Sequence, residues 1–180
     1  MPNSPPEFVE SSCLSDAVLK SFLGECGEEV CVYSGCRIVP GEKVRLGSRS
    51  QIDEGVFIFA GEGVEIGVHV HVAFGASISG GGACRIGDFA SIGAGVRILT
   101  GTDNLDASKL NNPTIPSSER AVLRRFTDVG AFSLVFTNSI VFPGVNIGEG
   151  TVVAAGSIVH HDLLPWTVYA GNPLVPVSDR

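Results

Sequence analysis

The sequence predicts one domain built as a parallel β-helix, and three observations lead to that prediction. An aliphatic residue returns at every sixth position between Val129 and Leu164, a period of neither a helix nor a simple strand alternation. Five of the chain's 23 glycines lie between these positions, where sharp corners need them, at residues 130, 144, 148, 150 and 156. Apolar residues make up 44% of the chain but aromatic residues only 7%, which suits a thin core. In such a solenoid each six-residue unit makes one strand and one corner, and three units close a triangular coil. The repeating residues are Val129, Val135, Val141, Ile147, Val153 and Val159.

The N-terminal part, residues 1–29, contains one predicted helix over residues 15–23. Ser15 suits the N-cap, Asp16 suits the first turn and Gly24 ends the helix. We expect its apolar stripe to cover the open end of the solenoid, because an uncovered coil exposes strand edges. The stripe consists of Leu14, Val18, Leu19, Phe22 and Leu23.

The β-helix itself is predicted over residues 30–164, after an irregular first coil at residues 30–39. The six-residue period is clear from Leu46 and slips by two residues at AGEGVEIG and again at SGGGACRIG. Both slips are glycine-rich, so we expect bulged corners that leave the coil intact. The period vanishes between Ile98 and Val129, which predicts an ordered, functional arm at about residues 100–128. Residues 165–180 are expected to form an irregular tail.

Composition narrows the classes of protein and partner. A net charge of −7 and a pI near 5.0 argue against a nucleic-acid partner. No apolar run reaches the length of a membrane span and the first residues lack a signal-peptide pattern, so the cytoplasm is the expected location. The five cysteines lack a paired zinc spacing. We expect them to be small, reduced, buried residues, with Cys84 pointing inward.

The repeats, the arm and the ending PGVNIGEGTVVAAGSIV with PWTVYAGNP resemble the hexapeptide-repeat acyltransferases. The stretches QIDEGVFIFAGEGVEIG, VHVAFGASISGGG and TDN…NNPTIP are similar to the small acetyltransferases of surface-polysaccharide and lipopolysaccharide biosynthesis. This resemblance implies a left-handed parallel β-helix, a homotrimer and transfer of acetyl from acetyl-CoA, without a metal, to a sugar hydroxyl or amine. The acceptor could be a sugar, a nucleotide-sugar or a glycan. The resemblance also implies an active site between adjacent subunits, with a histidine as general base.

His71 is the candidate base. It lies between inward-facing Val70 and Val72, so strand alternation points it outward. Counting three units on places it one coil below Ser91, near the root of the arm, and it matches the family's VHI-type motif in phase. His69 is the alternative base. His160 and His161 fall where relatives carry a corner that faces CoA.

The acidic candidates follow from the chemistry of acyl transfer. A neutral imidazole can take the proton of the attacking hydroxyl or amine, and its tautomer needs a partner on the other nitrogen. Asp103 is the leading partner, since it matches the first acid of the family's Asp-Asp/Asn pair. Asp53 and Glu54 are alternatives for orienting the base or holding the acceptor, and Asn112 matches the family's Asn-Pro and could bind the sugar.

The cofactor groove is expected along the C-terminal coils. Small residues there offer a smooth backbone for the pantetheine arm, Gly171-Asn172-Pro173 would turn near the adenine, and His161 or Arg180 would meet the phosphates. The small residues are Ala154, Ala155, Gly156 and Ser157. Relatives often carry Lys-His where this chain has Ala131-Phe132, and Ile-Gly where it has Val135-Phe136, and these differences would reshape the groove.

Two other interpretations stay open. One is an acetyltransferase of xenobiotics or other small molecules, because the sequence does not identify the acceptor. The other is a non-catalytic or carbonic-anhydrase-like β-helix, but a zinc site of that kind gathers three histidines, and His69 and His71 have no third histidine near them in the sequence.

Overall fold

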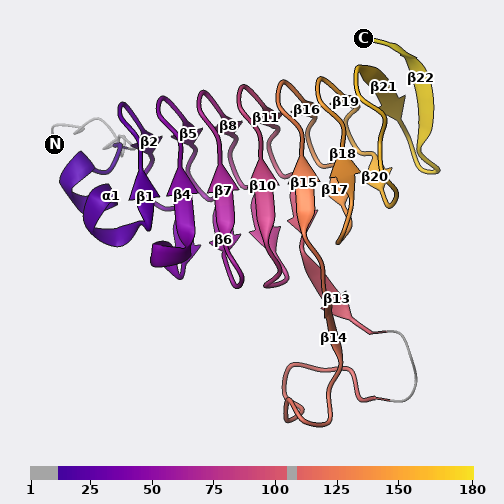
Figure 1. Ribbon diagram of the computed structural model, residues 1–180, viewed down its shortest axis with the longest axis horizontal. Coiled ribbons are helices and arrows are strands. Elements are labelled where there is room, and N and C mark those ends of the chain that lie inside the picture. The colour runs from indigo at the N-terminus through magenta and orange to yellow at the C-terminus, as the bar shows by residue number, and fades with distance from the viewer. Residues whose placement is uncertain (1–11, 105–108) are drawn as a thin grey trace, which may run out of the picture.

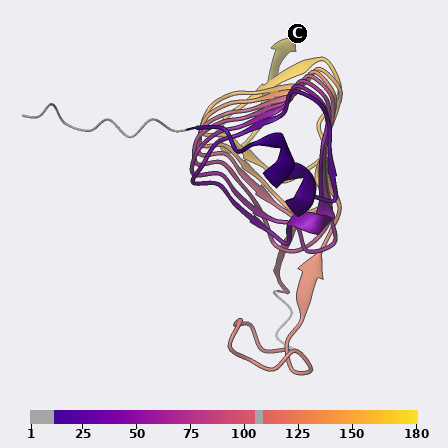
Figure 2. The same ribbon diagram turned by 90° about the vertical axis from the view of Figure 1, so that its left-hand side faces the viewer.

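The computed structural model describes residues 12–104 and 109–180 and shows a parallel β-solenoid of triangular section (Figures 1 and 2). Each coil contributes one short strand to each of three sheets, and strands of successive coils pair in parallel. The predicted fold class, a left-handed parallel β-helix with a short N-terminal helix and an arm, is confirmed. Among the described residues, no helix is both long and apolar enough to cross a membrane.

The three sheets form the three faces of the prism, named here in chain order. The first face consists of β1 (Glu25–Cys26), β4 (Val44–Leu46), β7 (Val64–Ile66), β10 (Cys84–Ile86), β15 (Thr127–Val129) and β18 (Asn146–Ile147). The second face consists of β2 (Cys31–Val32), β5 (Gln51–Ile52), β8 (His71–Val72), β11 (Ser91–Ile92), β16 (Leu134–Val135), β19 (Val152–Val153) and β21 (Thr167–Ala170), and β22 (Val175–Asp179) joins it at the end. The third face consists of β3 (Arg37–Val39), β6 (Phe57–Phe59), β9 (Ser77–Ser79), β12 (Arg97–Leu99), β17 (Ile140–Val141) and β20 (Ile158–Val159).

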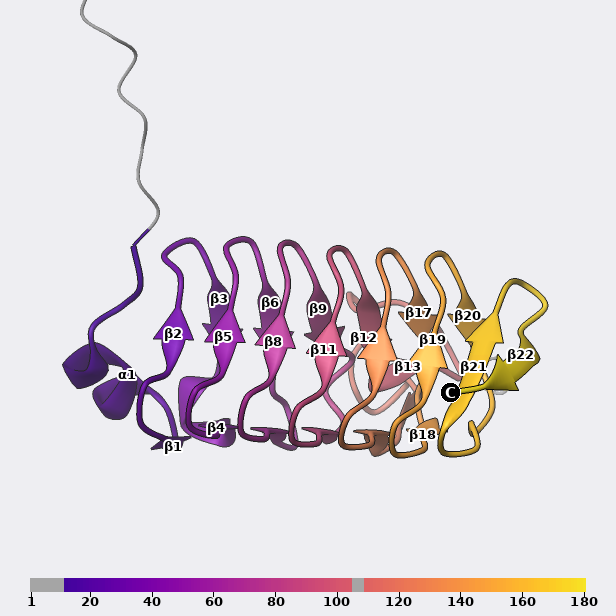
Figure 3. The ribbon, with the colours of Figure 1, turned by 90° about the horizontal axis from the view of Figure 1, so that it is seen from above.

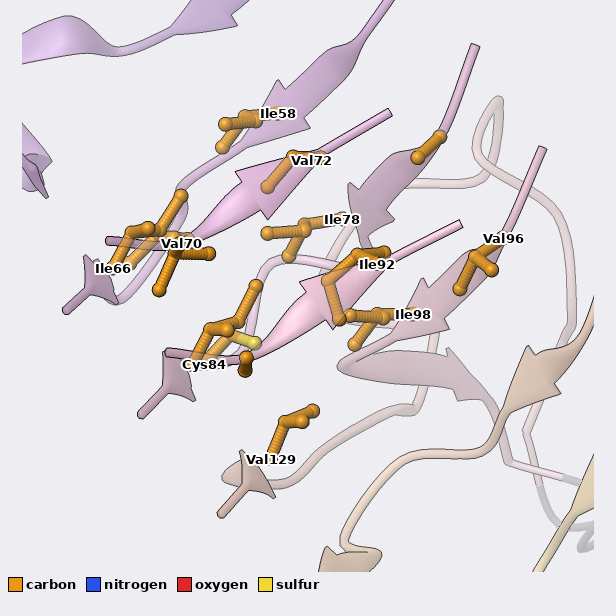
Figure 4. Packing of buried hydrophobic residues seen from close by; sticks show 14 of the residues in the cluster. Ile58, Ile66, Val70, Val72, Ile78, Cys84, Ile92, Val96, Ile98 and Val129 are labelled. Atoms are coloured by element: carbon orange, nitrogen blue, oxygen red, sulfur yellow. The ribbon is translucent and has the colours of Figure 1, made fainter. Parts of the chain in front are cut away.

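The core is a set of aliphatic columns running along the prism, because the inward residue of each strand lies on that of the next coil (Figure 4). Ile52, Val72 and Ile92 form such a column on the second face, and each is at most 1% exposed. The two predicted slips are corners that leave the coil intact, since Val64 pairs with Val44 on one side and with Cys84 on the other.

The corners differ between the edges of the prism. On the edge between the second and third faces, the left-handed backbone position is held by glycine in most coils, as at Gly55 and Gly75. On the edge between the first and second faces, the same backbone conformation is held by large residues such as His69 and Phe89. A side chain in this region costs about 1–2 kcal/mol, so the second arrangement is less relaxed.

Both ends differ in detail from the prediction. Helix α1 (Asp16–Phe22) lies across the N-terminal end of the prism (Figure 2), and of the five predicted apolar side chains only Leu19, within the helix, and Leu23, directly after it, are buried. The solenoid begins at Glu25. The first coil was expected to be irregular but has a strand on every face, and its third strand, β3, precedes a short 3-10 turn (Gly41–Lys43). The tail predicted to be irregular is also ordered, since β21 continues the second face and β22 pairs with it in antiparallel fashion.

The predicted arm leaves the edge between the third and first faces and projects away from the prism (Figures 1 and 2). Its base is an antiparallel pair of β13 (Gly101–Asp103) and β14 (Val122–Arg124). Arm residues 105–108 lie outside the described residues.

The cysteines only partly follow the prediction. Cys84 is buried as expected, and burial raises the pKa of its thiol to about 12. The prediction of five reduced cysteines is wrong, because Cys13 and Cys31 form a disulfide. The segment before α1 runs antiparallel to Tyr33, with Leu14 N–H donating to Val32 O, and this places the two cysteines side by side.

Candidate active site

His71 and Asp53 form a hydrogen-bonded pair on the second face. His71 Nε2 lies 2.9 Å from Asp53 Oδ2, and the two side chains are 45% and 24% exposed. They meet because β8 stacks on β5 with His71 opposite Gln51, and Asp53 follows β5 at the corner. The outward direction predicted for His71 and its position next to Ser91 are both present in the structure.

The environment of Asp53 keeps this carboxyl ionised. Partial burial raises its pKa, but hydrogen bonds from Gln51 and His71 outweigh that effect, so the pKa is lowered overall. The Gln51 amide donates to Asp53 Oδ1 over 2.7 Å, which leaves Oδ2 for the imidazole. An ionised carboxylate can only accept hydrogen bonds, so Nε2 of His71 carries the proton and Nδ1 is free to accept one.

A pocket of about 310 Å³ opens beside this pair. Its walls combine the rings of Tyr33 and Phe74 with the polar groups of Gln51, Asp53 and Glu54. Glu54 and Phe74 are both exposed, and they occupy equivalent corner positions in adjacent coils. The pocket therefore offers two carboxyl groups and two aromatic rings to a small polar ligand.

The outward row of the second face changes character along the prism. Gln51, His71 and Ser91 stack in register and are polar, whereas Leu134 and Val152, on the next two coils, are aliphatic. All five are half-buried. A polar reacting centre is thus followed, towards the C-terminus, by an apolar track.

The arm residues are not near His71 within one chain. Asp103 accepts hydrogen bonds from Nε and Nη2 of Arg120, at 3.1 and 2.9 Å, across the base of the arm. Asn112 lies in the exposed outer part, where its side chain accepts from Thr114 N–H. The arm leaves the edge opposite the second face (Figures 1 and 3), whereas the sequence had placed its root near His71.

The candidate cofactor residues form the last corners between the second and third faces. Ala155 and Gly156 are exposed, Ala154 is half-buried, and Ser157 is buried, where its hydroxyl accepts from Gly171 N–H over 3.0 Å. That bond ties the Gly171-Asn172-Pro173 turn to this corner. His161 lies elsewhere, on the edge of the arm, edge-on to His160 at 4.9 Å.

Two further residues complete these interactions and were not found from the sequence. Gln51 orients Asp53, and Arg120 holds Asp103. The register could have suggested Gln51, because it lies one coil below His71 and two residues before Asp53. Arg120 bonds Asp103 across the base of the arm, and because the arm has no repeat, the sequence does not indicate which of its residues lie opposite each other. His69 points out at the corner and stacks on Phe89 at 5.1 Å, away from the His71–Asp53 pair.

In comparisons with known proteins, no family model matches the chain. The chain is 30% identical over 93 residues to the dTDP-4-amino-4,6-dideoxy-D-glucose acyltransferase of Escherichia coli. The matched segment covers 52% of this chain and 48% of that enzyme, so it spans about half the length of the curated relative.

Solved structures match over nearly the whole chain. AntD, an N-acyltransferase from Bacillus cereus in complex with dTDP and 3-hydroxybutyryl-CoA, is 28% identical with a TM-score of 0.87, covering 95% of this chain and 91% of that one. The hexapeptide-repeat acetyltransferase VCA0836 from Vibrio cholerae, complexed with acetyl-CoA, shares the fold at 21% identity and a TM-score of 0.62, over 91% of this chain and 74% of that one.

These neighbours bind CoA or its thioesters. Within residues 12–104 and 109–180, no three His, Cys, Asp or Glu side chains gather in a way that could hold a metal ion. The chain therefore shares the β-helix fold of these structures and is similar in sequence to the two acyltransferases named above, AntD and the Escherichia coli enzyme.

Proposed function

We propose that this protein is an acyl-CoA-dependent N-acyltransferase that acylates the amino group of a nucleotide-linked amino sugar, in the biosynthesis of a surface glycan. The observation that carries the proposal is the His71–Asp53 pair beside a pocket lined by carboxyl groups and aromatic rings. The names of AntD and of the Escherichia coli enzyme support an amine on a dTDP-linked sugar as the acceptor. Acyl-CoA as the donor fits the cytoplasmic location expected from the sequence.

His71 acts as the general base in this proposal. The amine nitrogen attacks the thioester carbonyl carbon while its proton passes to Nδ1 of His71. Asp53, bonded to Nε2–H, fixes the tautomer and stabilises the imidazolium that forms. The tetrahedral intermediate then collapses, the C–S bond breaks, and the proton on His71 passes to the departing CoA thiolate.

The acceptor and the donor approach from opposite ends of the second face. Glu54 and Asp53 would attract the acceptor's ammonium group before it loses its proton, and Tyr33 and Phe74 would pack on the sugar ring. The aliphatic track at Leu134 and Val152 would carry the pantetheine towards Ser91, starting from the small corner at residues 154–157. The acyl group is acetyl or a short relative of it.

The working unit in this proposal is the homotrimer implied by the resemblance. Among the outward-facing apolar residues, Phe59, Phe74, Phe89 and Phe136 are 40–63% exposed in the single chain, and Phe57 and Val68 are half-buried. Exposure of this extent is typical of a protein that associates. Trimerisation would also bring an arm, with Asp103 and Asn112, from one subunit to another.

The test is release of the CoA thiol with a dTDP-linked 4-amino sugar as acceptor. His71→Ala should lower kcat by about 10²–10⁴-fold, the usual contribution of a positioned general base. The affinity for acyl-CoA, measured by calorimetry, should change little, because His71 meets the acceptor. His69→Ala is the matched control and should keep most activity. Near-wild-type turnover by His71→Ala would refute the assignment of the base, and no turnover with any amino sugar nucleotide would refute the acceptor class.

A further inference from the structure

The disulfide between Cys13 and Cys31 lies on the same face as the candidate active site. β2 is the first strand of the second face, and its outward residue Cys31 pairs with Gln51, which in turn pairs with His71. Neighbouring strands lie about 4.8 Å apart, so the disulfide is two coils, roughly 10 Å, from the imidazole. The outward row that holds His71 therefore begins with a bond that a thiol can cleave.

The disulfide fastens a short strap, residues 12–14, to the open edge of β2 (Figure 3). Two backbone hydrogen bonds accompany it. Leu14 N–H donates to Val32 O over 2.8 Å, and Ser34 N–H donates to Ser12 O over 2.9 Å. All three strap residues are exposed, so their side chains do not anchor the strap in the core. Exposed hydrogen bonds of this kind open easily, and the covalent bond is therefore what keeps the strap in place.

The core does not depend on this bond. The segment that follows the strap is α1, and it is anchored by Leu19 and Leu23, which are 1% and 7% exposed. Directly after them, Gly24 N–H donates to Val44 O over 3.0 Å and ties the chain to the first face. Cleavage of the disulfide would therefore free the strap without opening the solenoid.

The strap supports the corner that forms one wall of the acceptor pocket. This first corner, residues 33–36, follows β2 and begins with Tyr33, which lines the pocket. On one side Tyr33 pairs with Cys13 in antiparallel fashion, and on the other its N–H donates to Ile52 O over 2.9 Å. Tyr33 thus lies between the strap and β5, and its position depends on both.

The first corner also contacts both residues that bring a carboxyl group to the pocket. Gly35 packs so closely on Glu54 that a Cβ at this glycine would lie 3.0 Å from Glu54 Cγ. The thiol of Cys36 donates to the backbone oxygen of Asp53 over 3.0 Å. A change in the strap is therefore transmitted through the corner to the partner of His71.

The setting favours a bond that opens and closes. The sequence predicts a cytoplasmic location, where disulfides are usually transient and redox-sensing and rarely structural. Cys13 is exposed, so an attacking thiolate can reach its sulfur, whereas Cys31 is half-buried. The bond thus combines access from solvent with contacts that lead to the pocket.

We propose that the Cys13–Cys31 disulfide is a redox-sensitive clasp that controls acceptor binding. With the bond closed, the strap holds the first corner and the pocket is formed. With the bond reduced, the strap and the corner loosen and the pocket binds the acceptor less tightly. Acyl-CoA is unaffected, because it approaches from the other end of the second face. The clasp rests on the proposed function only for the identity of the ligand in the pocket.

The reductant is a dithiol. One of its thiolates attacks Sγ of Cys13, the S–S bond breaks, and Cys31 leaves as a thiolate that takes up a proton. The second thiol of the reductant loses its proton and displaces Cys13 from the mixed disulfide. Two electrons thus pass to the two protein sulfurs, which end as thiols, and the reductant ends as its own disulfide.

The first measurements need no substrate. Titration of the unfolded chain should find three thiols before treatment with dithiothreitol and all five cysteines after it. In NMR spectra, reduction should speed amide exchange at Leu14 and Ser34 and should shift the ring signals of His71. The ring signals of His160 and His161, which lie on the edge of the arm, are the internal control and should not move. Far-UV circular dichroism should stay unchanged.

The second measurement is the KM for a dTDP-linked 4-amino sugar. If the released pocket is formed about a tenth of the time, reduction should raise this KM about tenfold and leave the Kd for acyl-CoA unchanged. Cys13→Ser should have the raised KM and should not respond to dithiothreitol. Cys26→Ser is the matched control. It removes a half-buried thiol outside the bond and should respond as the wild type does.

Several outcomes would overturn the clasp. They are five thiols in the oxidised chain, unchanged amide exchange at Ser34 on reduction, and shifts of the His160 and His161 signals as large as that of His71. A released strap with an unchanged KM for the acceptor would overturn the link to binding. If no amino sugar nucleotide is acylated, the proposed function fails, and the NMR measurements still decide whether the disulfide controls the pocket.

Discussion

Asp53→Asn should damage the enzyme more than Asp53→Ala, although asparagine is the closer match in shape. Gln51 donates to Oδ1 of Asp53, so in the Asp53→Asn variant the new side-chain carbonyl stays with Gln51 and the new NH₂ group takes the place of Oδ2. That NH₂ group donates to Nε2 of His71 and moves the imidazole proton to Nδ1, the nitrogen that must accept the substrate proton. The wrong tautomer is thereby stabilised.

The magnitudes follow from these contacts. Loss of the base function should lower kcat by about 10²–10⁴-fold in Asp53→Asn. Asp53→Ala removes a hydrogen bond to a charged group, about 1.5–3 kcal/mol, and should cost about 10–10²-fold. In the double variant Gln51→Ala/Asp53→Asn, the side-chain amide at position 53 is no longer held by Gln51 and can rotate to present its carbonyl oxygen to His71. The second substitution should therefore restore activity about threefold to tenfold, since a neutral hydrogen bond is worth about 0.5–1.5 kcal/mol.

The assay is CoA release at saturating acyl-CoA and acceptor, with folding checked by circular dichroism. Gln51→Ala alone is the control and should lose only a few-fold. If Asp53→Asn is as active as Asp53→Ala or more so, or if Gln51→Ala fails to rescue it, the tautomer argument is wrong.

Three further predictions test the electrostatics, the arm and the core. Because the pKa of Asp53 is lowered in the folded protein, its ionised form stabilises the fold above about pH 4, the ordinary carboxyl range, and this contribution is lost as pH falls through the lowered pKa. The difference in the free energy of unfolding in urea between wild type and Asp53→Ala should therefore shrink from pH 7 to pH 3. A constant difference would contradict the pairing. Asp103→Ala and Arg120→Ala should each weaken the base of the arm, measured as faster proteolysis near residues 101–124. The double variant should be cleaved no faster than either single variant, because the two residues act as a pair. Additive increases in the rate of cleavage would contradict this. Ile78→Ala, at a site 1% exposed inside a column, should lower the free energy of unfolding by about 2–5 kcal/mol in urea titration, and a loss below 1 kcal/mol would mean that the coil can collapse around the gap.

The sequence by itself determined the fold, because a solenoid repeats one local solution. Every sixth position from residue 129 to residue 159 is aliphatic and the corners recur at a fixed spacing, so the period gives the strands, the register and the direction of each side chain. That is why the outward position of His71 and its place beside Ser91 could be predicted. The arm was also predicted from the sequence, as the segment in which the six-residue period stops.

Only the tertiary structure decided which side chains meet. Asp53 is the partner of His71 because β8 stacks on β5. Gln51 lies opposite His71, and Asp53, two residues after Gln51, thereby comes within hydrogen-bond distance of the imidazole. Asp103, favoured by the family motif, is held by Arg120 at the far edge. The disulfide and the ordered tail escaped prediction for the same reason, since Cys13 and β22 pair with the solenoid outside its repeat. Periodicity specifies contacts between equivalent positions of neighbouring coils, but contacts made by aperiodic segments depend on where the chain folds back in space.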